Sequence, residues 1–249
     1  MALNVSQASS QPGTPSITSA GVTNAASFQT GIAPGGIVTI FGKNLGAAPG
    51  QVVNAPGLPW PGQLANTRVT MNGFIAPVFQ LLNLNGQEQL SVQAPWALSG
   101  ANSAAVIVST ASGSAASVTV PVLGAHPGIF ILDPAASGAT HADGSLATST
   151  KPAARGEVVI LYLTGLGPVT NQPATGASAS LTALSPTLLI PQLLIGGFNA
   201  PVAFSGLAPG YIGLYQINVT VPQVVASGLV DLTVQVNGVT SNTAKLAIQ

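Results

Sequence analysis

The chain has 249 residues, of which 47% are hydrophobic and only 4% are charged, with five Lys and Arg in total against five Asp and Glu. So few charges exclude a basic surface for nucleic acid, and the absence of cysteine excludes disulfides and thiolate-bound metals. Since the net charge is zero and the mean hydropathy is +0.52, copies of the chain repel one another little, which favours a homo-oligomer.

The first segment, residues 1–19, is rich in Ser, Gln, Pro, Gly and Thr and predicts an extended N-terminal arm. It lacks the basic start and apolar core of a signal peptide. In its opening "ALNVSQ", Leu3 and Val5 alternate with polar residues and share one face. We expect them to form an assembly contact, with the arm of one copy added to a sheet edge of the next.

After the arm, short apolar runs alternate with turn signals to the end of the chain. Asn-Gly pairs at 72–73, 85–86 and 237–238 predict tight hairpins, because both residues tolerate positive φ. The pair at 143–144, Asp-Gly, predicts a similar turn. The run "DLTVQV" at 231–236 alternates apolar and polar side chains, as a half-buried strand does. Twenty Pro and 29 Gly disfavour long helices, so the pattern predicts an all-β sandwich architecture.

The chain repeats itself. "GGIVTIFGKNLG" at 35–46 matches "GEVVILYLTGLG" at 156–167, segment 69–79 matches 193–204, and segment 88–100 matches 214–228. Three matched blocks in the same order predict two homologous immunoglobulin-like β-sandwich modules, residues 20–132 and 133–249, joined near 123–135. The most apolar runs, 156–167 and 187–198, are broken by Gly or Pro and fall short of the roughly 20 residues of a spanning helix. We therefore expect no integral membrane segment.

These motifs, together with "APVFQLLNLNGQEQLSVQAPW" and "GLAPGYIGLYQINVTVP", resemble a family of paralogous C-terminal domains known chiefly from Solibacter-type Acidobacteria. The resemblance covers nearly the whole chain after residue 20. The element "APGGIVTIFGKNLG" is also similar to the opening of IPT/TIG immunoglobulin-like domains. The resemblance implies an extracellular, immunoglobulin-like tandem with no assigned activity and no catalytic residues to carry over.

Residues able to perform chemistry are sparse: His126, His141, Asp133, Asp143, Asp231, Glu88 and Glu157. His141 and Asp143 lie in "THADGS", where a turn is favoured over an acid–base pair, and His126 precedes Pro127 as a connector residue. Asp133 and Asp143 suggest a weak Ca²⁺ site, but their spacing matches no EF-hand loop. We predict no enzyme activity, no catalytic residues, no cofactor and no transition metal.

Two tryptophans remain. Trp96 in "APWALSG" predicts a core or inter-module plug, whereas Trp60 lies in a Pro-flanked loop and is a candidate ligand contact. We predict a non-enzymatic extracellular structural protein that joins head-to-tail, through its arm, into a filament or surface layer. The alternative is a cell-surface adhesion or glycan-binding module using Trp60. Either protein is extracellular or on the cell surface.

Overall fold

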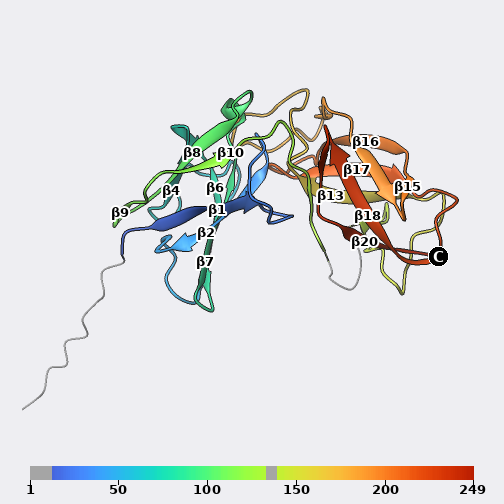
Figure 1. Ribbon diagram of the computed structural model, residues 1–249, viewed down its shortest axis with the longest axis horizontal. Helices are drawn as coiled ribbons and strands as arrows, with labels where there is room; N and C mark the ends of the chain where they lie inside the picture. Colours follow the sequence, from blue (N-terminus) through green and yellow to red (C-terminus); the bar gives the residue numbers. More distant parts are fainter. Residues whose placement is uncertain (1–12, 133–138) are drawn as a thin grey trace, which may run out of the picture.

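The computed structural model describes residues 13–132 and 139–249, and shows two β-rich modules side by side in an arch (Figure 1). The assembly residues Leu3 and Val5, and Asp133 of the suggested Ca²⁺ site, lie outside the described residues. The one helix in the described part is a three-residue 3-10 turn, Trp96–Leu98, and no helix there has the length and apolarity to cross a membrane. The all-β prediction is confirmed.

Each module is a sandwich of antiparallel sheets. In the first module, one sheet has the order β1-β2-β7-β6-β3, and the facing sheet has the order β10-β8-β4-β5 with β9 added to β8. The strand bounds are β1 Ser16–Asn24, β2 Ile37–Lys43, β3 Gln51–Asn54, β4 Arg68–Met71, β5 Phe74–Ala76, β6 Val78–Leu84, β7 Gln87–Gln93, β8 Ser103–Thr110, β9 Gly113–Ser114 and β10 Val118–Pro121.

The second module repeats this connectivity, except that no strand in the described residues corresponds to β3. One sheet has the order β11-β13-β17-β16 with β12 on β13, and the other has β15-β14-β18-β19 with β20 on β18. Its strands are β11 Gly128–Ile129, β12 Ala139–Thr140, β13 Val158–Thr164, β14 Gln192–Ile195, β15 Phe198–Asn199, β16 Val202–Leu207, β17 Tyr215–Thr220, β18 Gly228–Val236, β19 Val239–Thr240 and β20 Ala244–Ile248. The two modules together form a tandem of immunoglobulin-like sandwiches.

Local turn chemistry explains the hairpins. Asn72, Asn85 and Asn237 have φ of 49°, 53° and 49°, and the glycine after each is also left-handed. These are the type I′ turns that the Asn-Gly pairs predict. The Asp-Gly turn differs, because Gly144 has positive φ and Asp143 does not; the Gly144 amide donates instead to the His141 carbonyl at 3.0 Å.

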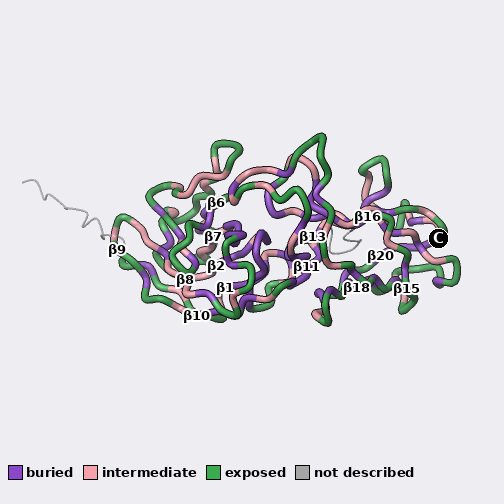
Figure 2. Tube along the Cα trace, turned by 90° about the horizontal axis from the view of Figure 1, so that it is seen from above, coloured by how far each residue is buried: buried purple, intermediate pink, exposed green. Residues whose placement is uncertain are grey.

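The cores are built from small aliphatic side chains that alternate with outward residues, as in β17, where every second residue is buried. Figure 2 shows buried segments inside both modules and at their junction. Trp96 comes from the first module but packs in the core of the second and is 5% exposed. It is the inter-module plug that its sequence context predicts.

Two predicted module boundaries need correction. Strand β1 begins at Ser16, inside the segment 1–19 assigned to the arm, because Ser16 and Ile17 pair with the end of β2. The second module begins before residue 133, since Gly128 and Ile129 pair with β13. Residues 16–17 and 128–129 are too short to show an alternation with a period of two in the sequence. Only their pairing with the neighbouring strand assigns them to a sheet.

Candidate functional site

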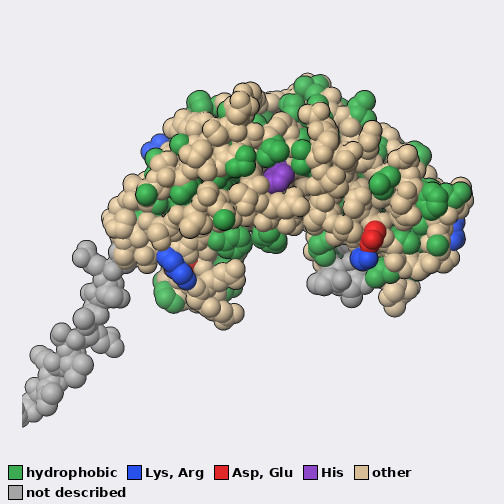
Figure 3. All heavy atoms as spheres, in the orientation of Figure 1, with side chains coloured by type: hydrophobic (Ala, Val, Ile, Leu, Met, Phe, Trp, Pro, Cys, Tyr) green, Lys and Arg blue, Asp and Glu red, His purple; other side chains and the backbone are tan. Residues whose placement is uncertain are grey.

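A groove on the first module ends against the second module, and its lining is almost entirely apolar. It encloses about 520 Å³, within the size of small-molecule sites, roughly 300–1,000 Å³. Figure 3 shows apolar side chains gathered on the inner side of the arch. We call this hollow the aromatic groove, and its lining includes Phe28, Ile37, Thr39, Leu58, Trp60, Phe79, Gln89, Ser91, Phe130, Tyr211, Ile212 and Leu214.

The floor of the aromatic groove is the outer face of the β2–β7 strand pair. Val38 and Ile40 point into the core, so the alternate residue Thr39 faces the groove beside its cross-strand partner Ser91. Gln89 follows on the same face of β7. Among the described residues, the side chains of Thr39, Gln89 and Ser91 have no hydrogen-bond partner in the protein, and no acidic, basic or histidine side chain lines the groove. The floor therefore offers free hydroxyl and amide groups without charge.

One wall is an aromatic pair, Trp60 and Phe79, with ring centroids 4.9 Å apart and planes 26° from parallel. Phe79 is the extra residue of a β-bulge, because Val78 pairs with Val92 and Gln80 with the neighbouring Ser91. A bulge turns a side chain out of the regular alternation, and Phe79 is 38% exposed as a result. Both rings line the groove, so the pair forms an apolar aromatic wall.

The far end of the groove is Tyr211, which is 59% exposed and lies on the loop between β16 and β17. This loop is fixed to the first module through Gly213. The Thr164 hydroxyl donates to the Gly213 carbonyl at 2.8 Å and accepts from the Ile37 amide at 2.7 Å. Both modules therefore contribute to one preorganised site.

A second clamp holds the Trp60 loop. The Trp60 amide donates to the Gly176 carbonyl at 2.9 Å, and the Gly176 amide donates to Oε1 of Gln93 at 2.6 Å. The Trp96 amide donates to the Thr175 hydroxyl at 3.2 Å. The second module thus supports Trp60, the predicted ligand contact, from behind.

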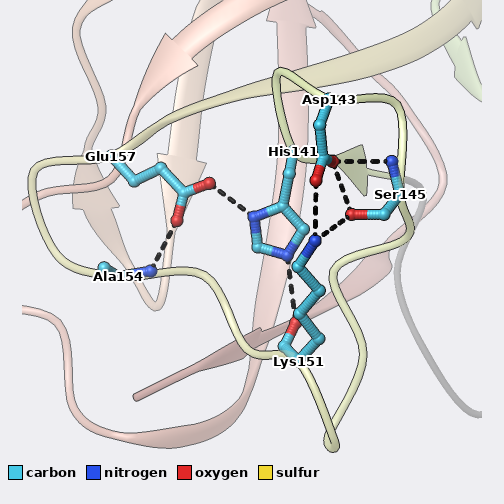
Figure 4. A network of polar contacts seen from close by, with 6 residues as sticks. All are labelled: His141, Asp143, Ser145, Lys151, Ala154 and Glu157. Atoms are coloured by element: carbon cyan, nitrogen blue, oxygen red, sulfur yellow. Dashed lines mark hydrogen bonds and ion pairs between the residues drawn. The ribbon is translucent and has the colours of Figure 1, made fainter.

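The remaining sequence candidates lie elsewhere. His141 is buried, with Nδ1 2.5 Å from Glu157 Oε1 and Nε2 3.0 Å from the Lys151 carbonyl (Figure 4). Burial opposes protonation of the ring, but the hydrogen bonds to Glu157 and to the Lys151 carbonyl outweigh it and raise the pKa of His141. The second Glu157 oxygen accepts from the Ala154 amide at 2.8 Å. These groups are engaged in holding the turn and offer no free base.

Asp143 makes an ion pair with Lys151 at 2.8 Å and accepts from the Ser145 amide and hydroxyl (Figure 4). The Lys151 and Ser145 contacts hold the pKa of Asp143 well below its usual range. Its charge is already matched by Lys151, and no three His, Cys, Asp or Glu side chains cluster for a metal within the described residues. Nothing at Asp143 therefore supports the suggested Ca²⁺ site.

His126 lies at the junction and is 4% exposed. Its amide donates to the Gly165 carbonyl at 2.8 Å, and its carbonyl accepts from Asn24 Nδ2 at 2.7 Å. Burial lowers the pKa of His126, against the opposing hydrogen bond between its ring and the Gly31 carbonyl. His126 joins the modules as a neutral, buried connector.

Sequence reasoning singled out Trp60 but missed Phe28, Phe79 and Tyr211. One signal was present. The chain has seven Phe, two Trp and three Tyr, and of these twelve only Trp96 and Tyr215 are buried. Because the cores hold almost no aromatic side chains, the others had to lie on the surface or at the junction, but their convergence depends on the tertiary structure.

No family model and no curated protein match the chain. Among solved structures, SGBP-B of the Bacteroides ovatus mixed-linkage glucan utilization locus, in complex with a heptasaccharide, is 13% identical with a TM-score of 0.34. That alignment covers 88% of this chain and 42% of the other. SGBP-B of a Bacteroides uniformis xyloglucan utilization locus is 12% identical, with a TM-score of 0.28 and coverage of 87% and 45%. The chain thus spans less than half the length of either SGBP-B.

A tandem of immunoglobulin domains from titin is 10% identical, with a TM-score of 0.24 and coverage of 95% of this chain and 96% of that one. Domains 4–9 of the surface-layer protein SbsC are 15% identical, with a TM-score of 0.25 and coverage of 96% and 31%. At these identities and TM-scores, the likeness transfers no ligand and no assembly to this chain.

Proposed function

We propose that the chain is a non-enzymatic extracellular binding module that holds an uncharged glycan in the aromatic groove. The observation that carries this proposal is the combination of aromatic rings with hydroxyl and amide side chains in one groove whose described lining has no charge. Sugar rings have apolar C–H faces and hydroxyl edges, so they match both kinds of surface. Among the residues that the structure describes, the lining holds no carboxylate, imidazole or amine for acid–base chemistry, which supports binding without catalysis.

An entirely apolar partner fits this groove less well. Docking such a partner would cover the half-buried Gln89 and Ser91 without hydrogen bonds, and each unpaired polar group costs about 1–3 kcal/mol. A charged ligand would lose its hydration on binding and find no opposite charge in the groove to compensate for that cost. A neutral polyhydroxylated ligand avoids both penalties.

A glycan array followed by isothermal titration calorimetry tests the proposal. We expect binding to neutral glycans in preference to acidic ones, and about three- to tenfold weaker binding for both Trp60→Ala and Phe79→Ala. The matched control is Phe198→Ala, because Phe198 is also exposed, at 46%, but lies outside the groove on β15. Wild-type protein that binds no neutral glycan would overturn the proposal.

Self-association through a second surface is the other candidate function. In the segment between β13 and β14, four exposed side chains form what we call the aliphatic ridge: Leu181, Leu184, Leu188 and Ile190. The segment is held firmly, since Asn171 Nδ2 donates to the Leu184 carbonyl at 2.8 Å and the Thr187 hydroxyl bonds the Ser205 hydroxyl at 3.0 Å. Exposed aliphatic side chains concentrated in one well-held segment make it a candidate interface.

The occupant we favour for the aliphatic ridge is a second copy of the chain. With zero net charge, two copies approach without electrostatic repulsion. This contact, or the predicted donation of the arm through Leu3 and Val5, would make the protein a subunit of a filament or surface layer. A contact between unlike surfaces builds a filament when the rotation between successive copies does not close into a ring.

A further inference from the structure

The aromatic groove continues beyond Tyr211 into a second hollow of about 410 Å³ on the second module. Phe130, Tyr211 and Leu214 line both hollows, so the two meet along these three residues. The second hollow adds Leu132 and Tyr162, and we call it the second-module subsite. Of the twelve aromatic residues, six line the two hollows: Phe28, Trp60, Phe79, Phe130, Tyr162 and Tyr211.

The second-module subsite is fixed relative to the first. Tyr162 is on β13, the strand that ends at the clamping residue Thr164. The Phe130 amide donates to the Tyr162 carbonyl at 3.0 Å, which ties the segment after β11 to the same strand. Because the hydrogen bonds of Thr164 hold the two modules together, we expect a ligand that fills both hollows to order no hinge on binding, so that the two subsites combine in one affinity.

The rims of both hollows are open. Phe28, Leu58 and Tyr211 are each more than half exposed, and Leu132 is 42% exposed, so the walls do not enclose a ligand's ends. We infer that the site takes the interior of an extended neutral glycan chain, with successive sugars on Trp60–Phe79, on Tyr211 and in the second-module subsite. A mono- or disaccharide would fill only one hollow. This inference rests on the proposed glycan function and adds that the ligand is a polymer.

The test is a length series. Gluco-, manno-, xylo- and galacto-oligosaccharides of about two to eight sugars are titrated into the full chain by calorimetry, starting from those that the array identifies. We expect affinity to rise about tenfold or more between the shortest and longest members of the bound series, and then to level off once both hollows are filled.

Variants test whether the rise in affinity with chain length comes from the second-module subsite. Tyr162→Leu keeps apolar bulk but removes the ring, so we expect it to lose most of the affinity gain for long chains. Leu132→Ser tests the same subsite without altering a strand, and Phe198→Ala is the control. Trp60→Ala weakens short and long ligands alike.

The outcomes separate the two ideas. The polymer inference is wrong if short and long oligosaccharides bind with equal affinity. It is also wrong if Tyr162→Leu and Leu132→Ser both bind long chains as wild type does. Either result leaves glycan binding intact. Absence of binding to every neutral saccharide would overturn glycan binding itself, and the polymer inference with it.

Discussion

Thr164, at the end of β13, and Ile37, at the start of β2, join the two copies of the repeated sequence. The Ile37 amide donates to the Thr164 hydroxyl at 2.7 Å, and that hydroxyl donates to Gly213 at 2.8 Å. Thr164 is fully buried, so water cannot take the place of its hydroxyl as the hydrogen-bond partner of the Ile37 amide and the Gly213 carbonyl. The first strand of each module is scaffold, and the contact between them positions the loop that carries Tyr211.

Thr164→Val keeps the shape of the side chain but removes both hydrogen bonds. We expect the free energy of unfolding to fall by about 1–3 kcal/mol, because a buried amide and a buried carbonyl lose their partner. Chemical denaturation measures this. The control is Thr140→Val, since the buried Thr140 hydroxyl has no partner in the described structure and its loss should be neutral or stabilising. Equal destabilisation by the two variants would show that the clamp contributes nothing.

Gly35 and Trp96, both of the first module, are in contact beside the junction. Gly35 has φ of +77°, and a Cβ there would lie 2.1 Å from the Trp96 ring. We expect Trp96→Ala to destabilise by about 3–5 kcal/mol, and Gly35→Ala to destabilise through both collision and backbone strain. In the double variant the ring is gone, so its loss of stability should be smaller than the sum of the two single losses. Strict additivity in denaturant titrations would contradict this contact.

We interpret Phe28 as a residue whose backbone is strained and whose ring contributes to the ligand site. It lines the aromatic groove with φ of 56°, a left-handed conformation that bulky residues rarely adopt but Asn tolerates. We expect Phe28→Asn to be about 0.5–1 kcal/mol more stable than Phe28→Ala, since both lose the ring and only Asn relieves the backbone. Both variants should bind ligand more weakly than wild type. Thermal unfolding that ranks Ala above Asn would argue against strain at this position.

The two histidines should respond to pH in opposite directions. The folded-state pKa of His141 is raised, so its contribution is present below the unfolded value of about 6.5 and is lost as pH rises through the folded pKa. The folded-state pKa of His126 is lowered, so its contribution is present above about 6.5 and is lost as pH falls.

Single variants separate these effects. His126→Gln leaves only His141, and its stability should decline as pH rises above about 6.5. His141→Gln leaves only His126, and its stability should decline as pH falls below about 6.5. Melting temperatures on both sides of this pH measure both slopes. Parallel slopes in the two variants would refute the assignment.

The aliphatic ridge predicts association. We expect wild-type protein to form oligomers that the double variant Leu188→Ser, Ile190→Ser dissociates, because two exposed aliphatic side chains are removed from the interface. Val224→Ser with Leu229→Ser removes comparable exposed side chains outside the ridge and is the control. Removal of residues 1–12 tests the arm separately and spares β1. Light scattering that finds every version monomeric would exclude both contacts.

The sequence by itself determined the strands, the turns and the duplication. Alternation with a period of two and left-handed Asn-Gly pairs are local properties, so Asn72, Asn85 and Asn237 predict hairpins without knowledge of the rest of the chain. The buried position of Trp96 was also predictable, because a large side chain between two small-residue cores fills their junction.

Only the tertiary structure decided the site. Phe79 reaches the groove because a bulge displaces it, and the corresponding bulge of the second module carries the small Ala203 instead. Tyr211 reaches it because Gly213 approaches Ile37 so closely that a Cβ there would lie 2.9 Å from the Ile37 side chain. Bulge position and loop docking depend on contacts between residues far apart in the chain. No local pattern encodes them, and the groove exists only once the two modules have packed together.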